Sequence, residues 1–532
     1  MAPAPTSGLG RWLRTPGSDV VAAVLLGLVI FSKPVPNVLL IAPPVLHLWR
    51  QQRFRHGFAV GLVCAAVVVG GFSLNAAISG EFNYQGGLDR KYISVDFPFE
   101  GPGLEFDELG NSMTTDGIVV EEPLGPVAFL TLLTHNLWYF LVGRHFGFIP
   151  FFFPGVVVLL LFLRSRAEAQ VWHWLILATA ALAAVTLAVY MPYTWSGGGG
   201  PSGNRYYLSA YPLFLFLTPP LRGHASAITA WLGGSLFTAQ ILVNPFVSAR
   251  QPYLAPERGL FRLLPVELTM VRDLPIVLDG PRARVIYGEN PPMQLYFLDH
   301  NASLPEAQEI WIAGGRRADI IVRMPMELET LTVTARSPIA NVVSIDIGDG
   351  EHRIALDPGM PGSVTIRASG VYSRQSWAYL LSVTTRDGFV PRLRERDSID
   401  TRYLGVALRL PPTVHATYYT RRQAEEIAER LYRAILQREI APRARAAATT
   451  RVQLGQLENL VRFMIDSREF VDLRQRAQPA ELLKAFYAGL LPRAPDASGA
   501  DDSLREILQG RYHEAIMDLL EAEEFEATLS SQ

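Results

Sequence analysis

The sequence predicts a chain of three parts: a polytopic α-helical membrane domain, then an all-β sandwich, then an all-α repeat domain. The first 250 residues hold nearly all of the long apolar runs. Between about residues 284 and 410 apolar and polar residues alternate with a period of two, which is typical of half-buried strands. From Tyr418 the period becomes helical and a segment repeats. We expect a cytoplasmic tail over 1–18, a membrane domain over 19–250, a linker over 251–283, an extracytoplasmic β-sandwich over 284–412, and a helical domain with two repeats over 413–532.

Composition excludes several classes of function. The 532 residues carry a formal net charge of −2, so the chain has no general affinity for nucleic acid. Cys64 is the only cysteine, which excludes an internal disulfide and a cysteine-based metal site. Arg11 and Arg14 precede an apolar run, but no small-residue cleavage site follows, so we do not expect a cleavable signal peptide.

The first apolar run, Val20–Trp49, is interrupted by Ser-Lys-Pro-Val-Pro at 32–36. Each proline removes a backbone donor and ends or kinks a helix. Arginines flank both ends of the run and prefer the cytoplasm, so we expect two short helices that enter and return, with a single kinked span as the alternative. Lys33 at this break is costly in a membrane and is expected to face protein, water or a phosphate, unless it snorkels to the interface.

Gly57–Ala77 is long enough to cross the ~30 Å apolar core of a bilayer. It leads to an acidic loop, Ile78–Glu122, in which Glu81 is the candidate acid nearest the membrane, although solvated surface charge is the simpler interpretation of any one carboxylate there. Gly125–Gly143 is amphipathic and predicts a helix lying at the interface. The later crossings are expected over 156–163, 171–191, 208–219 and 227–246, which leaves the loop at 193–207 and everything after about residue 250 outside the cytoplasm.

The loop Tyr193–Tyr207 has five glycines between two apolar runs. Glycine permits positive φ and close approach of a ligand, so the loop is a candidate binding site. It fits G-x-G-x-x-G, but the flanking transmembrane runs exclude a dinucleotide-binding βαβ unit. Arginine binds phosphate through a planar fork of donors, so a lipid-linked phosphate or pyrophosphate suits this region, the alternative being simple anchoring to lipid headgroups. The candidate substrate-binding residues are Lys33, His135, Arg144, Trp195, Asn204, Arg205 and Tyr206; no metal ligand is assigned.

The sequence predicts seven strands after the linker, with Asp349-Gly350 as a hairpin turn. Such a pattern indicates a sandwich of jelly-roll or immunoglobulin-like type, which acts as a spacer or lid or binds sugars. The predicted strands are 319–324, 330–335, 342–347, 353–356, 363–367, 379–384 and 403–410. In the last domain, Tyr432 and Phe470 have counterparts 55 residues later at Tyr487 and Phe525, which indicates two repeats and an interaction module without an evident catalytic constellation.

The segment Trp195–Leu208 followed by Tyr211-Pro212 resembles the late-span loop of bacterial GT-C type glycosyltransferases related to dolichyl- or polyprenyl-phosphate mannosyltransferases. Gly143–Pro154 resembles their interfacial segment, and Phe31–Pro34 their short broken helix. The resemblance implies a polyprenyl-phosphate sugar donor, inverting transfer to a cell-envelope acceptor outside the cytoplasm, and often a divalent metal. Residues 420–528 resemble a domain of unknown function appended to bacterial surface proteins.

The resemblance is to the C-terminal half of that family. The family's catalytic carboxylate lies in its first outside loop, and no position here matches it, so no catalytic residue is carried over. The expected protein is therefore either an incomplete transferase or a non-catalytic relative. The leading hypothesis is a multi-pass glycosyltransferase, or its C-terminal part, of the bacterial inner membrane. The alternative is a non-catalytic envelope membrane protein that binds glycans or protein partners.

Overall fold

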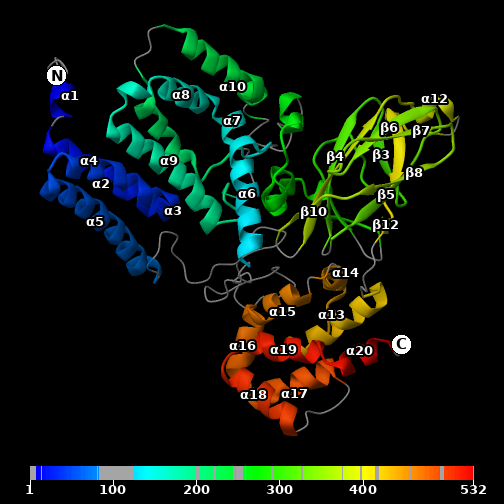
Figure 1. The fold of residues 1–532 in the computed structure, drawn as a ribbon. Coiled ribbons are helices and arrows are strands. Elements are labelled where there is room, and N and C mark those ends of the chain that lie inside the picture. Colours follow the sequence, from blue (N-terminus) through cyan, green and yellow to red (C-terminus); the bar gives the residue numbers. More distant parts are fainter. Residues whose placement is uncertain are drawn as a thin grey trace.

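The chain is described here from a computed structural model, which describes residues 8–530 with gaps. The residues outside the description are 1–7, 14, 81, 83–124, 198–202, 220–222, 244–245, 247–255, 258, 289–292, 325–326, 374–375, 396–397, 414–418, 454, 456, 492–496 and 531–532. An N-terminal helical region, a central β-sandwich and a C-terminal helical region follow one another along the chain (Figure 1), so the predicted fold class is confirmed at this level. Glu81 and most of the acidic loop lie outside the described residues.

The second helix of the helical region ends at Ser32, as the prolines at 34 and 36 predict. The elements are α1 (Gly8–Trp12), α2 (Pro16–Ser32), α3 (Pro34–Asn37), η1 (Val38–Ile41), α4 (Ala42–Arg50), α5 (Phe54–Ser79), α6 (Pro126–Val142), α7 (Phe148–Phe151), α8 (Phe153–Arg164), η2 (Arg166–Glu168), α9 (Val171–Tyr190), η3 (Leu208–Leu217) and α10 (Ala225–Val243).

Two of the described helices, within Phe54–Ile78 and Val171–Tyr190, are long and apolar enough to cross a membrane. The core helix of a soluble protein and a signal sequence share this length and composition. Most residues of each segment are not buried by other parts of the chain.

The segment Leu208–Pro219, expected to cross the membrane, forms a 3₁₀ helix of ten residues, η3. At ~2 Å of rise per residue it is shorter than the ~30 Å apolar core. Pro212 lies inside it and has no N–H to donate.

The proline-rich stretch predicted as a linker is a packed connector. Its fully described elements are four short 3₁₀ helices: η5 (Gly259–Leu263), η6 (Leu268–Asp273), η7 (Pro275–Leu278) and η8 (Gly280–Arg282). Met270, Leu274 and Ile276 are buried in one apolar core with residues of α6, α9, η3 and the sandwich. The connector therefore joins the helical region to the sandwich through a shared core.

The sandwich consists of two antiparallel sheets. One has the order β1-β2-β4-β10-β6-β7 with β9 beside β10, and the other has the order β12-β5-β11-β3 with β8 beside β5. All seven predicted strands are present, and the Asp349-Gly350 turn joins β6 to β7. The strands are β1 (Val285–Tyr287), β2 (Met293–Phe297), β3 (Ile310–Ala313), β4 (Arg317–Met324), β5 (Thr330–Arg336), β6 (Asn341–Asp346), β7 (His352–Leu356), β8 (Gly362–Arg367), β9 (Val371–Tyr372), β10 (Trp377–Thr385), β11 (Leu404–Arg409) and β12 (Pro412–Thr413), with the short helix α12 (Pro391–Arg394) before β11.

The C-terminal region has a core of its own, which includes Leu431, Phe470, Phe486 and Phe525. Its helices come in two sets of four. α14, α15 and α16 begin 55 residues before α18, α19 and α20 (497 − 442, 512 − 457 and 523 − 468). The helices are α13 (Arg421–Ile435), α14 (Pro442–Gln453), α15 (Leu457–Ile465), α16 (Arg468–Arg476), α17 (Pro479–Leu490), α18 (Ala497–Leu508), α19 (Tyr512–Leu520) and α20 (Glu523–Ser530).

Candidate functional site

The two ends of the glycine-rich loop between α9 and η3 lie against each other. The carbonyl oxygen of Ser196 accepts hydrogen bonds from the backbone N–H of Arg205 (3.0 Å) and of Tyr206 (3.4 Å). Gly197 turns the chain with φ +103°, a conformation that favours glycine. The guanidinium of Arg205 donates to the carbonyl oxygen of Gly197. Residues 198–202, the tip of the loop, lie outside the described residues.

Two cations meet at the ring of Tyr206. Lys33 Nζ lies 2.8 Å from the ring centroid, and Cζ of Arg205 lies 5.6 Å from it. Within the described part of the chain, no carboxylate forms an ion pair with Lys33 or Arg205. Like charges that share a site repel each other, and an anion between them would remove that cost. The helix break at Lys33 and the glycine-rich loop thus form one cationic site, which we call the Tyr206 site (Lys33, Arg205 and Tyr206).

The break is held against the loop by hydrogen bonds next to the Tyr206 site. Asn37 Nδ2 donates to the carbonyl oxygen of Val29 (3.2 Å), and Ser209 Oγ donates to Asn37 Oδ1. Tyr207 is buried, and its hydroxyl donates to the carbonyl oxygen of Ala180 in α9 (2.8 Å). The backbone on both sides of the Tyr206 site is therefore fixed to α2 and α9.

Trp195 and Asn204, also predicted to bind substrate, are buried beside the Tyr206 site. The indole ring of Trp195 packs against Phe140 (5.9 Å between centroids) and Phe146 (6.2 Å). Asn204 Oδ1 accepts from the backbone N–H of Tyr207 (3.0 Å). His135 lies on α6, where its Nδ1 is 2.8 Å from the carbonyl oxygen of Thr131. Five of the seven predicted residues therefore lie at the glycine-rich loop and the neighbouring helix break, whereas His135 lies on another element.

Arg144, the seventh, occupies a different environment. It is almost fully buried, and Nη1 donates to Oδ2 of Asp319 on β4 (2.8 Å). Its other nitrogens donate to the carbonyl oxygens of Leu264 (3.2 Å) and Arg262 (3.1 Å). The donors of Arg144 are thus directed at the connector and the sandwich, and we do not include it among the anion-binding residues proposed below.

Asp319 is the centre of a buried network of charges between the helical region and the sandwich. Arg317 Nε lies 2.8 Å from Oδ1 of Asp319, and Arg262 Nη2 lies 3.3 Å from its Oδ2 and 2.8 Å from Asp299. Burial raises the pKa of Asp319, but the guanidinium groups of Arg144, Arg317 and Arg262 outweigh burial and lower the pKa to about 2. The carboxylate is therefore charged at neutral pH and balances the buried guanidinium of Arg144 and the partly exposed ones of Arg262 and Arg317.

A second buried pair links the turn after α6 to the connector. Glu267 accepts from the backbone N–H of His145 (2.8 Å) and of Phe146 (2.9 Å), and its Oε2 lies 2.7 Å from Nδ1 of His145. Thr269 Oγ1 donates to Asn136 Oδ1 on α6 (2.7 Å). These contacts attach the connector to the helices at several points.

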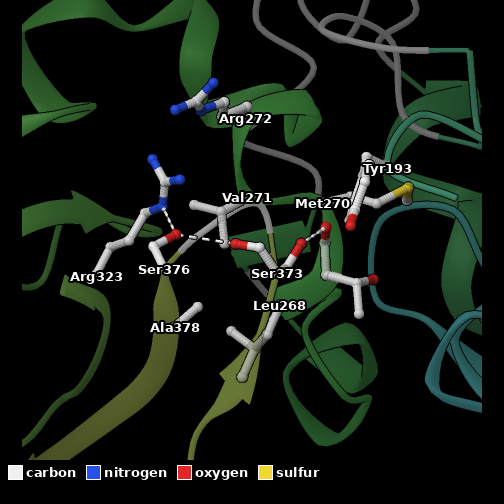
Figure 2. A pocket seen from close by; sticks show the side chains of 10 residues that line it. Tyr193, Leu268, Met270, Val271, Arg272, Arg323, Ser373, Ser376 and Ala378 are labelled. Carbon is white, nitrogen blue, oxygen red and sulfur yellow. Dashed lines mark hydrogen bonds between the residues drawn. The ribbon is translucent and has the colours of Figure 1, made fainter. Parts of the chain in front are cut away.

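The cleft in Figure 2 lies between the connector and the sandwich, near the start of the loop. Ser373 Oγ donates to the carbonyl oxygen of Thr269 (2.7 Å), and Arg323 Nε donates to Ser376 Oγ (2.7 Å). Tyr193 lies on the opposite side of the cleft from Arg323 (Figure 2). A volume of about 10 Å³ admits about one water molecule, so this cleft is an interdomain seam too small for a sugar.

Sequence reasoning missed Ser196, Asp319 and Glu267. Asp319 and Arg323 are buried charged residues of β4, a strand that is apolar apart from them and its first residue, Arg317, and a buried charge in such a strand requires a partner. Glu267 gave no comparable signal in a proline-rich stretch. In the described ranges no group of three or more His, Cys, Asp or Glu side chains is arranged to hold a metal ion, so the divalent metal implied by the resemblance has no identified site there.

No protein-family model matches the chain, and no curated protein matches it, so the resemblance to GT-C glycosyltransferases has no family match to support it. Among solved structures, "Structure of TmCBM61 in complex with beta-1,4-galactotriose at 1.4 A resolution" aligns with 24% of this chain and 92% of that chain, at 11% identity and a TM-score of 0.14. A TM-score this low carries no argument about the ligand or activity of this chain.

Proposed function

We propose that the chain is a multi-pass protein of the bacterial inner membrane that binds a lipid-linked glycan at the outer face through the phosphate that joins lipid to sugar. The observation that carries this proposal is the Tyr206 site, in which Lys33 and Arg205 share one ring and neither has a carboxylate partner among the described residues. A phosphate provides the missing negative charge and accepts several hydrogen bonds from arginine.

The lipid part of the ligand is supported by the surroundings of the Tyr206 site. The loop follows α9, one of the two helices apolar enough to cross a membrane, and the other, α5, packs against α2, the helix that ends next to Lys33. Large apolar side chains on these helices, such as Leu62 and Leu182, are exposed on the chain itself. A polyprenyl chain in the bilayer would have access to such a surface, and its phosphate would lie at the interface.

We propose that the chain binds the lipid-linked glycan, and we propose no transfer of its sugar. Glycosyl transfer needs a residue that activates the acceptor hydroxyl, and Glu81, the sequence candidate nearest the membrane, lies outside the described residues. None of the described carboxylates pairs with either cation of the Tyr206 site. Transfer to an envelope acceptor therefore stays a prediction of the family resemblance.

The sandwich offers a second contact for the glycan. Tyr372 and Trp377 face each other across β9 and β10, with ring centroids 5.6 Å apart, and Tyr372 is exposed. Aromatic rings present an apolar face on which a sugar ring can pack. Titration of soluble oligosaccharides, followed by the part of the tryptophan fluorescence change that Trp377→Phe removes, tests this contact: a response also lost in Tyr372→Ala supports it, and no response to any glycan argues against it.

The phosphate proposal is tested by lipid binding to the purified chain in detergent, with a polyprenyl phosphate as the probe. Lys33→Gln and Arg205→Gln each remove one charge, and we expect each to weaken binding by roughly 10-fold or more, because a charge-assisted hydrogen bond contributes about 1.5–3 kcal/mol. The matched control is Arg166→Gln, an exposed arginine of η2. Equal binding by all four proteins would refute the proposal. Competition by inorganic phosphate separates recognition of free phosphate from recognition of the lipid.

A further inference from the structure

Three buried hydrogen-bond donors next to the Tyr206 site have no acceptor. Trp195 Nε1, Ser196 Oγ and Asn204 Nδ2 make no hydrogen bond in the described structure, and their residues are 0%, 2% and 4% exposed. Buried donors without an acceptor cost free energy, and the great majority of buried polar groups in native proteins are satisfied. Three in one short loop indicate an acceptor that the described residues do not supply.

The three donors lie on two segments of the loop that are hydrogen-bonded to each other. Residues 195–196 and 204–206 lie against each other, because the backbone N–H groups of Arg205 and Tyr206 both donate to the carbonyl oxygen of Ser196. Asn204 Oδ1 is already occupied by the backbone N–H of Tyr207, which leaves the amide nitrogen as the free end of that side chain. The Trp195 ring is fixed between Phe140 and Phe146.

The chemistry of these donors differs from that of the Tyr206 site. An indole N–H, a hydroxyl and a carboxamide are neutral, whereas Lys33 and Arg205 are charged and lie at half-buried and exposed positions. Placing an anion in a buried neutral site costs more than placing a neutral acceptor there. Neutral donors among aromatic rings suit the hydroxyl and ring oxygens of a sugar.

We propose that Trp195, Ser196 and Asn204 recognise the uncharged, hydroxyl-bearing sugar attached to the phosphate, while Lys33 and Arg205 hold the phosphate. The inference rests on the proposed function, since the sugar reaches these donors through its phosphate linkage. It assigns sugar specificity to the glycine-rich loop. It also explains why three buried donors are left without an acceptor when no ligand is present.

The test exploits opposite effects on stability and on binding. Trp195→Phe keeps an aromatic ring, a smaller one, and removes the N–H, and Ser196→Ala removes only the hydroxyl. Because the Ser196 hydroxyl has no partner among the described residues, Ser196→Ala should keep or raise the melting temperature, whereas Trp195→Phe leaves a cavity beside Phe140 and Phe146 and should lower it. The matched control is Tyr207→Phe, which removes a buried hydroxyl that does have a partner, the carbonyl oxygen of Ala180. This control should lower the melting temperature.

Affinity is then measured for a polyprenyl phosphate and for the same lipid bearing mannose, glucose or arabinose. We expect Trp195→Phe and Ser196→Ala to lose fivefold or more in affinity for at least one sugar-bearing lipid and to stay within twofold for the sugar-free lipid. Tyr207→Phe should leave the ratio of the two affinities unchanged. A lower melting temperature for Ser196→Ala, with unchanged affinity ratios for both donor variants, would overturn the inference and indicate a structural water. Binding of the sugar-free lipid without any discrimination of sugars would overturn the inference alone, whereas binding of neither lipid would overturn the proposed function with it.

Discussion

Nη1 of Arg144 donates to Oδ2 of Asp319 over 2.8 Å, although 175 residues separate the two in the sequence. Both side chains are almost fully excluded from solvent, at 4% and 0% exposure. The pair joins the turn after α6 to strand β4, and Arg262 of the connector lies against both residues. The sandwich is thus attached to the helical region by buried charges as well as by apolar contacts.

Removing one member of this pair should destabilise the chain strongly. Asp319→Leu leaves the Arg144 guanidinium buried without its carboxylate, and breaking such a pair costs about 3–5 kcal/mol. Thermal unfolding in detergent should report a large drop in melting temperature, together with faster proteolysis in the connector. The control is Glu351→Gln, which removes an exposed ion pair with Arg353 in the same sandwich and should leave the melting temperature nearly unchanged. Equal effects of the two changes would contradict this account of the interface.

The same carboxylate predicts a dependence of stability on pH. The pKa of Asp319 is lowered to about 2 from an ordinary value of 3.8, so its charged form stabilises the folded chain above pH 4. That contribution, about 2 kcal/mol, should be lost as the pH falls from 4 towards 2. Burial raises the pKa of neighbouring Asp299, which acts in the opposite sense, so the measurement compares the wild type with Asp319→Asn. Melting curves should converge as the pH falls; a constant difference would contradict the assignment.

Much of the sandwich could be predicted from the sequence, because alternation is a local signal. Val343, Ile345 and Ile347 were expected on one face and are all buried. The strands β1, β2, β3, β9 and β12 were missed; all of them except β2 have four residues or fewer, too few for the alternation to be clear.

The candidate site was predictable only in part. Lys33 and Arg205 were both predicted to bind phosphate, because a cation in or beside a membrane is costly unless it faces a group such as a phosphate. The sequence held no sign that both contact the ring of Tyr206. The sequence also could not indicate that Arg144 forms an ion pair with Asp319, because that contact depends on the packing of the sandwich against the helices.

Gly143 provides a test of the joint between α6 and the connector. A Cβ at this position would overlap Oε1 of Glu267 and the carbonyl oxygen of Tyr139. Gly143→Ala should therefore disturb the contact between Glu267 and the N–H groups of His145 and Phe146, and lower the melting temperature by several degrees. Gly70→Ala is the matched control, because a Cβ there meets open space. If Gly143→Ala is as well tolerated as Gly70→Ala, the packing around Glu267 is looser than described.

The proposed orientation in the membrane predicts the location of two positions. Arginines favour the cytoplasmic side, so Arg222 is expected inside and the sandwich outside. Reporter fusions after Arg222 and after Gly288 should therefore report opposite sides of the membrane. A cytoplasmic signal at Gly288 would contradict the orientation and remove the sandwich from the outer face.

The central claim is that the Tyr206 site binds the phosphate of a lipid. The most direct measurement is the ratio of two affinities of the unmodified chain, for a polyprenyl phosphate and for the polyprenol of the same length. If Lys33 and Arg205 bind the phosphate, the phosphorylated lipid should bind at least ~10-fold more tightly, and the preference should weaken as salt is raised. Equal affinities for the two lipids would contradict the claim.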